Sequence, residues 1–286
     1  MKISFLSFLL KILPFISCFV LHAEELEIWI SSFQDQVYYE QMGDLYSEVS
    51  GKDFTINVKA YGFREMPDKL GVAVRSGQGI PDLVQLDETF FGVFLNEDST
   101  FMDLSQKIEN SGWAKYLHPR RLEVFTYKGK TMGVPQSLSA MVLYYRKDLF
   151  KEFNIEPSDL KTWADFAEVG AELQNDQGQR FMALDGTLFD VLLRQKGTDL
   201  FDKKGKFLPD EDKALSILEE FAEMSADQIT VMPDRGSIFD PVFFSGDLET
   251  GEVLCVPGAD WYGVDIFLQF APGMQGLGGM MHLPPS

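Results

Sequence analysis

The pattern of apolar and polar positions predicts alternating strands and helices in the first part of the chain. Short apolar or alternating runs indicate strands, and longer stretches with apolar residues three or four apart indicate amphipathic helices. The predicted elements are a strand over 26–30, a helix over 36–51, a strand over 54–61, a helix over 66–79 and a strand over 81–88. In the first helix the apolar residues at helical spacing are Val37, Met42, Leu45, Tyr46 and Val49. This β-α-β-α-β order predicts a largely parallel sheet covered by helices.

A second alternation begins after a stretch that reads as irregular up to about residue 130. A Gly-Val-Pro sequence at 133–135 and the strand-like MVLYY at 141–145 lead directly into a new helix. Thr162 followed by Asp165 has the spacing of a capping-box variant, which predicts the start of another helix. Strand-like and helix-like segments then continue to a final strand in GLGGMMHLPPS.

These two alternations predict an α/β protein with two lobes, one over residues 24–134 and the other over 135–286. No internal repeat and no low-complexity linker interrupts the chain. Open α/β sheets bind ligands at the carboxyl ends of their strands. Two such lobes facing each other would leave a cleft between those ends, so the pattern predicts a binding site there.

Residues 1–23 have the composition of a secretory signal peptide, with lysines beside an apolar stretch that ends in the small residue Ala23. A lysine and a proline interrupt the apolar stretch, which is short for a bilayer span. We expect cleavage after Ala23 and an exported protein, in the periplasm or outside the cell. The sequence FISC, ending at Cys18, keeps a bacterial lipoprotein anchor open as an alternative.

Composition excludes several classes of function. The chain has 44 acidic and 25 basic residues and a formal net charge of −19, so its surface repels phosphate backbones, and we expect no nucleic-acid partner. Cleavage after Ala23 would leave Cys255 as the single cysteine, which excludes an internal disulfide. With three histidines and no phosphate-loop motif, we expect no metal and no cofactor.

Five pieces of the sequence occur in an order shared with a known family. They are LEIWISSF, SGQGIPDLVQLDE, GKTMGVPQSLSAMVLYYRKDLFKE with KTWADF, FFSGDLETGEVLCVPGADW, and GGMMHLPPS. Together they resemble the extracellular solute-binding proteins of the maltose-binding type, which serve ABC importers. The resemblance extends from residue 26 to the end of the chain. It implies a type II periplasmic-binding-protein architecture, in which two lobes joined by crossing strands close on a ligand, usually a sugar.

The resemblance also implies partners, and it implies a path by which the chain of family members completes the first lobe. In the family the chain returns from the second lobe to complete the first, and this sequence ends before that return, so we expect an incomplete N-terminal lobe. The resemblance further implies a carbohydrate ligand, ABC permease membrane subunits as the recipients, and a monomer that carries out no chemistry.

The first set of candidate ligand-binding residues follows two predicted strands. In the family the residues just after the first strand line the cleft, and here these are Ser32, Phe33 and Gln34. Sugar hydroxyls need donors and acceptors, and the apolar face of a sugar suits an aromatic ring. The alternative is an ordinary loop in which serine caps the next helix. Asp87 and Thr89 follow the third strand, where they either bind hydroxyls or cap a helix.

The second set of candidates is Gln136, Ser139, Asp185, Asp260, Trp261 and Tyr262. Gln136 and Ser139 lie where the family's chain enters the second lobe and contacts ligand, and Asp185 ends the strand-like FMALD. Behind the glycine of GADWY the family commonly has an aromatic platform. Which of the last three residues reaches the cleft stays open.

The remaining aromatic residues are expected in packing roles. Tyr144 and Tyr145 alternate along one strand, so we expect at least one of them in the core. Trp163 lies in the first turn of a predicted helix, and Trp29 and Trp113 are read as packing residues.

Two other functions compete with capture of a sugar. A secreted glycoside hydrolase needs two facing carboxylates, and Asp87, Asp185 and Asp260 could supply such a pair. An acidic chain brings carboxylates together by chance, however, and no other catalytic motif is present. The third possibility is a sensor, or a binding protein for another solute such as a polyamine or peptide. The aromatic candidates favour a sugar over a cation.

Overall fold

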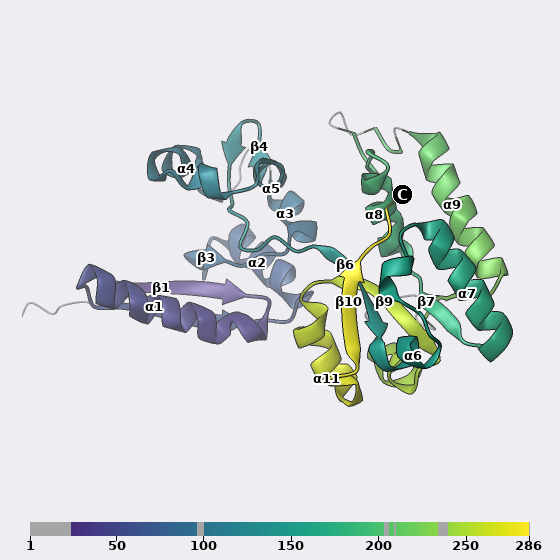
Figure 1. The fold of residues 1–286 in the computed structure, drawn as a ribbon. Helices are drawn as coiled ribbons and strands as arrows, with labels where there is room; N and C mark the ends of the chain where they lie inside the picture. The colour runs from purple at the N-terminus through teal and green to yellow at the C-terminus, as the bar shows by residue number, and fades with distance from the viewer. Residues whose placement is uncertain (1–23, 96–99, 203–205, 209, 234–239, 286) are drawn as a thin grey trace, which may run out of the picture. The chain divides into compact units, whose positions relative to one another are not determined.

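The computed structural model describes residues 24–95, 100–202, 206–208, 210–233 and 240–285. The predicted signal peptide, with Cys18, lies outside these residues. The chain divides into two compact units after Gln136, whereas the sequence placed the boundary after residue 134. Figure 1 shows the ribbon of both units, coloured from purple at the N-terminus to yellow at the C-terminus. In the described part of the chain, no helix has the length and apolar character needed to span a bilayer.

The first unit is built on a three-stranded parallel sheet in the order β2-β1-β3. Its strands are β1 (Glu24–Ile30), β2 (Phe54–Ala60) and β3 (Leu83–Val84). β1 and β2 pair residue for residue along their whole lengths, and β3 pairs with the end of β1. The parallel sheet predicted from the element order is confirmed.

Two helices connect these strands, α1 (Gln36–Ser50) and α2 (Glu65–Ser76). Each ends at a glycine with positive φ, 68° at Gly51 and 67° at Gly77, and the glycine N–H donates to a carbonyl of the last turn. α2 packs on β1 through a core of Trp29, Met66, Leu70 and Ala73.

The apolar residues of α1 do not form the buried face that their spacing suggests. Val37, Leu45 and Val49 are 59%, 48% and 79% exposed in the described structure. The helix instead approaches β2 at Gly43, where an added Cβ would lie 3.1 Å from Cγ1 of Ile56. Helical periodicity therefore predicted the helix correctly, but not which side of it faces the sheet.

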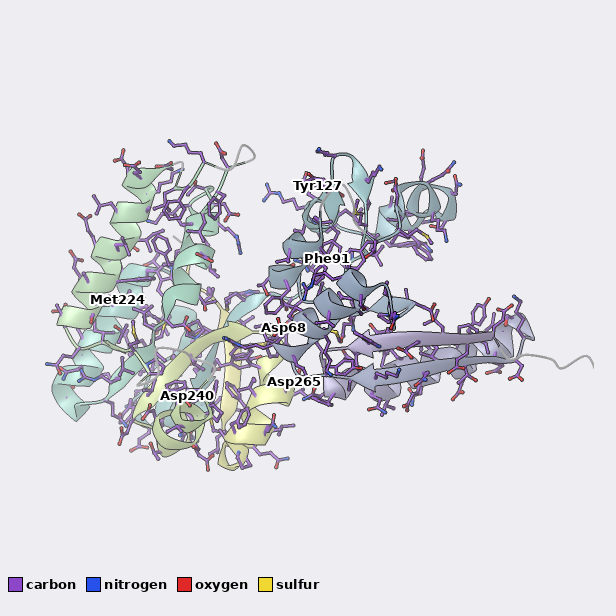
Figure 2. The ribbon with its side chains drawn as sticks, turned by 180° about the vertical axis from the view of Figure 1, so that it is seen from behind. Asp68, Phe91, Tyr127, Met224, Asp240 and Asp265 are labelled. Atoms are coloured by element: carbon purple, nitrogen blue, oxygen red, sulfur yellow. The ribbon has the colours of Figure 1, made fainter. Side chains whose placement is uncertain are left out.

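The stretch that reads as irregular contains regular structure, so that expectation was wrong. It contains α3 (Glu88–Phe94), α4 (Ser105–Ser111), α5 (Pro119–Val124) and a hairpin of β4 (Thr126–Tyr127) and β5 (Lys130–Thr131). Phe91 lies in this region (Figure 2). The centroid of its ring is 5.2 Å from that of Phe101 and 4.9 Å from that of Phe125. Elements this short show too few turns for a period to be visible in the sequence.

The second unit contains a mixed five-stranded sheet in the order β10-β6-β9-β7-β8. Its strands are β6 (Met141–Arg146), β7 (Arg180–Ala183), β8 (Thr230–Val231), β9 (Val253–Ala259) and β10 (Gly278–His282). β7 runs parallel to β8 and β9, while β6 runs antiparallel to β9 and β10. The start of β6 therefore lies at the same edge as the carboxyl ends of β7 and β9.

Helices and tight helical segments cover both faces of this sheet (Figure 1). One face packs against α6 (Lys147–Glu152), α7 (Trp163–Gln177), α8 (Gly186–Gln195) and α9 (Glu211–Ala226). The other face packs against α10 (Pro241–Phe243), α11 (Leu268–Phe270), π-helical turns at 244–248 and 263–267, and a 3-10 turn at 272–274. Along β6, Leu143 enters the first core, while Val142 and Tyr144 enter the second. The predicted capping box of Thr162 and Asp165 is present at the start of α7.

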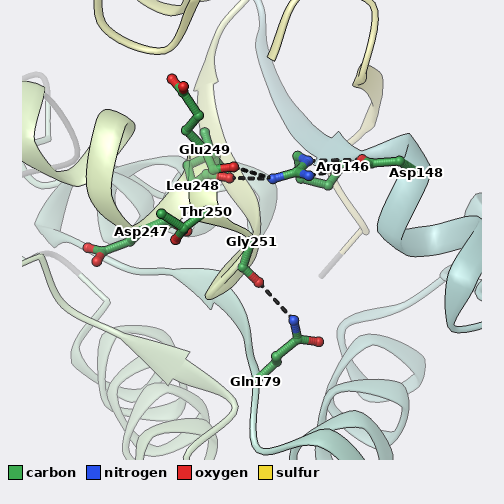
Figure 3. A network of polar contacts seen from close by, with 8 residues as sticks. All are labelled: Arg146, Asp148, Gln179, Asp247, Leu248, Glu249, Thr250 and Gly251. Atoms are coloured by element: carbon green, nitrogen blue, oxygen red, sulfur yellow. Dashed lines mark hydrogen bonds and ion pairs between the residues drawn. The ribbon is translucent and has the colours of Figure 1, made fainter. Parts of the chain in front are cut away.

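A buried arginine connects β6 to the end of the first π-helical turn (Figure 3). Arg146, 6% exposed, donates from Nη1 to the carbonyl oxygens of Leu248 and Glu249, both at 2.9 Å. Its Nε and Nη2 donate to Oδ1 and Oδ2 of Asp148 at 2.9 and 2.6 Å, and these two hydrogen bonds lower the pKa of the Asp148 carboxyl. Arg146 thus supplies donors to the carbonyls that end this turn.

Candidate ligand-binding site

A polar cluster lies at the carboxyl ends of β1 and β3 in the first unit. Gln85 follows β3, and its side-chain oxygen accepts from the backbone N–H groups of Ser31, at 3.0 Å, and Ser32, at 3.3 Å. Its amide nitrogen donates to Asp35 and, at 2.7 Å, to Oε1 of Gln136. One side chain therefore joins the ends of two strands to two further polar groups. We name Asp35, Gln85 and Gln136 the amide–carboxylate cluster.

The members of the amide–carboxylate cluster also hold one another. Nε2 of Gln136 donates to Oδ2 of Asp35 at 3.1 Å, so this carboxylate oxygen accepts from both amides. An ionised carboxylate has about four acceptor positions, so capacity remains on Asp35 for the hydroxyls of a ligand. Gln136 is exposed, and Asp35 and Gln85 are half-buried, which makes the cluster accessible from solvent.

Ser32, Phe33 and Gln34 lie in the turn between β1 and α1. Phe33 begins a 3-10 turn and is 62% exposed, so its ring faces solvent in the first unit. Ser32 occupies the residue before this turn but makes no capping bond with its side chain. Its hydroxyl donates to Oε1 of Gln34 at 3.3 Å instead. The structure therefore does not use Ser32 as a helix cap.

Asp87 and Thr89 lie at the start of α3. The Asp87 carboxylate accepts from the backbone N–H of Thr89 at 2.9 Å and from its hydroxyl at 2.6 Å. This is an N-cap, so the capping alternative is confirmed for Asp87. Both residues remain accessible, Asp87 half-buried and Thr89 exposed. A ligand role for them stays a prediction.

In the second unit, Ser139 and Asp260 lie at the edge where β9 ends and β6 begins. The backbone N–H of Asp260 donates to the carbonyl oxygen of Ala140 at 3.0 Å, which joins the turn after β9 to the segment before β6. Ser139 and Asp260 are both exposed, and Trp261 is 40% exposed. These are the accessible candidates in this unit.

Tyr262 differs from the expectation of an open aromatic platform, because it is only 1% exposed. Its ring lies parallel to that of Tyr144, with centroids 6.3 Å apart, and its centroid is 4.7 Å from that of Trp261. Burial raises the pKa of its hydroxyl. A ring enclosed in this way has no free face for a sugar, so of these two adjacent aromatic residues Trp261 is the accessible one.

The side chain of Asp185 is also less exposed to solvent than we expect of a carboxylate that accepts hydrogen bonds from a ligand. It is 5% exposed and caps α8, where its carboxylate accepts from the N–H of Thr187 at 2.8 Å. Its position at a strand end was predicted correctly. Its side chain, however, is committed to the helix and presents little surface to solvent in this unit.

The sequence interpretation missed Gln85 and Asp35. Gln85 was read as an interior residue of a strand over 81–88, but β3 contains only Leu83 and Val84, so Gln85 already lies beyond the strand. One signal was available, because Gln85 and Asp87 alternate along an extended segment and so share a side. Nothing local distinguishes Asp35 from the other acids of this chain.

The sequence profile of the family described as "Bacterial extracellular solute-binding protein" matches residues 42–265. The chain belongs to this family. This solute-binding protein is 25% identical over 265 residues to the arabinooligosaccharide-binding protein of Bacillus subtilis (strain 168), covering 91% of this chain and 60% of the relative. It is 28% identical over 193 residues to the lactose-binding protein of Rhizobium radiobacter, covering 65% of this chain and 45% of the relative. It therefore spans 60% or less of these relatives' lengths.

Its fold is similar to that of solved sugar-binding proteins. The sugar-binding protein MalE from Xanthomonas citri matches with a TM-score of 0.72 at 20% identity, over 91% of this chain and 66% of that chain. This likeness confirms the maltose-binding-type α/β fold implied by the sequence. The family consists of solute-binding proteins rather than enzymes, so the hydrolase alternative is set aside.

Proposed function

We propose that this solute-binding protein captures a sugar or oligosaccharide and delivers it to the membrane subunits of an ABC importer. It acts as a monomer, and no bond is made or broken. The observation that carries the proposal is the amide–carboxylate cluster at the strand ends of the first unit. The named sugar-binding relatives support the choice of ligand class.

The cluster has the chemistry that a polyhydroxylated ligand requires. Every sugar hydroxyl both donates and accepts, and the exposed amide of Gln136 can do the same with its second N–H and its second lone pair. The amide of Gln85 is fully used by its four protein partners, so its role is to hold Gln136 and Asp35 in place. The carboxylate of Asp35 adds a charged acceptor, which makes stronger hydrogen bonds than a neutral one. Because these side chains already hold one another, less conformational entropy is lost when a ligand binds.

Trp261 supplies the apolar contact on the second unit. Its ring is 40% exposed and follows the carboxyl end of β9, beside the exposed Asp260. A sugar can place its C–H face on such a ring while its hydroxyls bond to neighbouring polar groups. Several hydrogen bonds and one stacked ring are enough for a micromolar affinity, about −8 kcal/mol.

Calorimetry of the exported protein tests the ligand class. Arabino-oligosaccharides, lactose and maltose are titrated as sugars, and putrescine and spermidine as cations. We expect saturable binding of at least one sugar in the micromolar range and no binding of the polyamines. Tight polyamine binding without sugar binding would instead favour the non-sugar alternative, in which the acidic residues recognise a cation.

Export is part of the proposal, because the named family is extracellular. We propose cleavage after Ala23, with a lipid anchor at Cys18 as the alternative. The mass of the protein recovered from the producing cell's envelope distinguishes the two. A mature chain that starts at Glu24 supports cleavage, whereas incorporation of labelled palmitate, abolished by Cys18→Ser, supports the anchor.

A further inference from the structure

The hydroxyl of Tyr144 contacts the backbone of the turn that carries Asp260 and Trp261. Tyr144 lies on β6, the neighbour of β9 in the sheet. Its oxygen is 3.0 Å from the carbonyl oxygen of Ala259 and 2.9 Å from that of Asp260, in donor geometry to both. The same oxygen accepts from the N–H of Gly263 at 3.2 Å. One side chain therefore bridges the two ends of the turn.

The ring of Tyr144 is held firmly in the core. It is 6% exposed, lies parallel to the ring of Tyr262 with an interplanar angle of 12°, and makes an edge contact with Phe267 at 4.7 Å between centroids. Burial raises the pKa of its hydroxyl, which therefore keeps its proton and remains a donor at neutral pH. The hydroxyl therefore has a defined position, and its hydrogen bonds constrain the backbone of the turn.

The turn needs such a partner because regular structure stops on both sides of it. β9 ends at Ala259, and a π-helical turn begins at Gly263. A helix start has N–H groups without partners inside the helix, and buried backbone groups must find partners elsewhere. A tyrosine hydroxyl has one proton to donate and can also accept, so it can donate to one of the two carbonyls, or share its proton between them, and accept from the N–H at the other end.

We propose that Tyr144 is a positioning residue for sugar binding, which fixes the exposed ring of Trp261 through the turn without itself contacting the sugar. The inference rests on the proposed function, because it assigns Trp261 to the ligand. It adds a buried residue on a different strand to the determinants of affinity. Tyr144→Phe removes the three contacts of the hydroxyl while keeping the ring in the core.

The test compares Tyr144→Phe with Tyr145→Phe in the full chain. Tyr145 is the next residue on β6, and its ring packs in the other core against Phe150, with centroids 4.5 Å apart. We expect Tyr144→Phe to weaken the affinity for the sugar about three- to tenfold, the effect of losing one net hydrogen bond. Tyr145→Phe should leave the affinity unchanged.

A double-mutant cycle separates positioning from general structural damage. If Tyr144 acts through Trp261, then Tyr144→Phe should cost no further affinity in a Trp261→Ala background. The same fold-loss in both backgrounds would overturn the proposal, as would wild-type affinity in Tyr144→Phe alone.

A second measurement does not depend on sugar. The fluorescence of Trp261 is the part of the signal that is lost in Trp261→Phe. Acrylamide quenching of this part reports how accessible the ring of Trp261 is. Tyr144→Phe should change the quenching, and Tyr145→Phe should not. Unchanged quenching would overturn the role assigned to Tyr144. Failure of the proposed function is recognised separately, because the wild-type protein would then bind no sugar whatever the quenching shows.

Discussion

Gly258 lies directly against the ring of Tyr262. A Cβ added at residue 258 would lie 2.5 Å from Cδ2 of Tyr262, closer than any van der Waals contact. The glycine is fully enclosed near the end of β9, and Tyr262 is among the largest buried side chains of the chain. The turn with Asp260 and Trp261 therefore depends on a strand residue without a side chain, because the ring occupies that space.

The first prediction concerns this contact. Gly258→Ala should displace the ring of Tyr262 and lower the free energy of unfolding by about 1–3 kcal/mol, the usual cost of overpacking a core. Urea denaturation measures this change. Gly246→Ala is the matched control, because an added Cβ there meets no atom within 4 Å. Equal stability of the two variants would contradict the predicted clash.

The second prediction concerns the amide–carboxylate cluster. Gln85→Leu leaves two backbone N–H groups without their acceptor and removes the donor to Asp35 and Gln136. We expect at least tenfold weaker sugar binding by calorimetry, because Asp35 and Gln136 lose the amide that holds them in place and the ligand must then order them. Gln78→Leu, an exposed glutamine of the same unit, should bind as the wild type does. Wild-type affinity in Gln85→Leu would remove the cluster from the proposed site.

The third prediction compares two exposed tryptophans. Trp261→Ala should weaken sugar binding about tenfold or more, because it removes the ring on which the C–H face of the sugar is proposed to lie. Trp113, in a short 3-10 helix of the first unit, is 54% exposed and has no proposed ligand role. Trp113→Ala should therefore leave the affinity unchanged. If both variants lose affinity equally, the effect is not specific to the proposed platform.

The fourth prediction is a pH dependence of stability. Hydrogen bonds from Arg146 hold the pKa of Asp148 below its usual value. A lowered pKa in the folded state gives stability that is fully present above the unfolded pKa of about 3.9 and is lost as pH falls through the folded pKa. Asp148→Asn should therefore be less stable than the wild type at pH 6, and the difference should shrink as the pH approaches 3.

Thermal unfolding at a series of pH values measures this difference. Asp176→Asn provides the control in the same unit, because Asp176 is exposed and has no ion pair recorded in the described structure. A stability difference between wild type and Asp148→Asn that stays constant from pH 6 to pH 3 would show that the interaction with Arg146 does not depend on the charge of the carboxylate.

Local features of the fold could be predicted from the sequence because their causes lie within a few neighbouring residues. Gly51 ends α1 in the left-handed conformation that glycine adopts without strain, and Thr162 and Asp165 form the capping box of α7. Alternation along β6 placed at least one of Tyr144 and Tyr145 in a core, and Tyr144 is there. The order of strands and helices likewise predicted the parallel sheet of the first unit.

Only the tertiary structure decided which of these residues are accessible and which hold one another. Gln85 joins the ends of β1 and β3 across more than fifty residues of sequence, a contact that no local pattern encodes. Trp261 and Tyr262 are adjacent aromatic residues, yet one is 40% exposed and the other 1%, because Tyr262 turns into the core beside Gly258 and Tyr144. Local propensity and periodicity set the elements, whereas burial and long-range hydrogen bonds depend on how those elements pack.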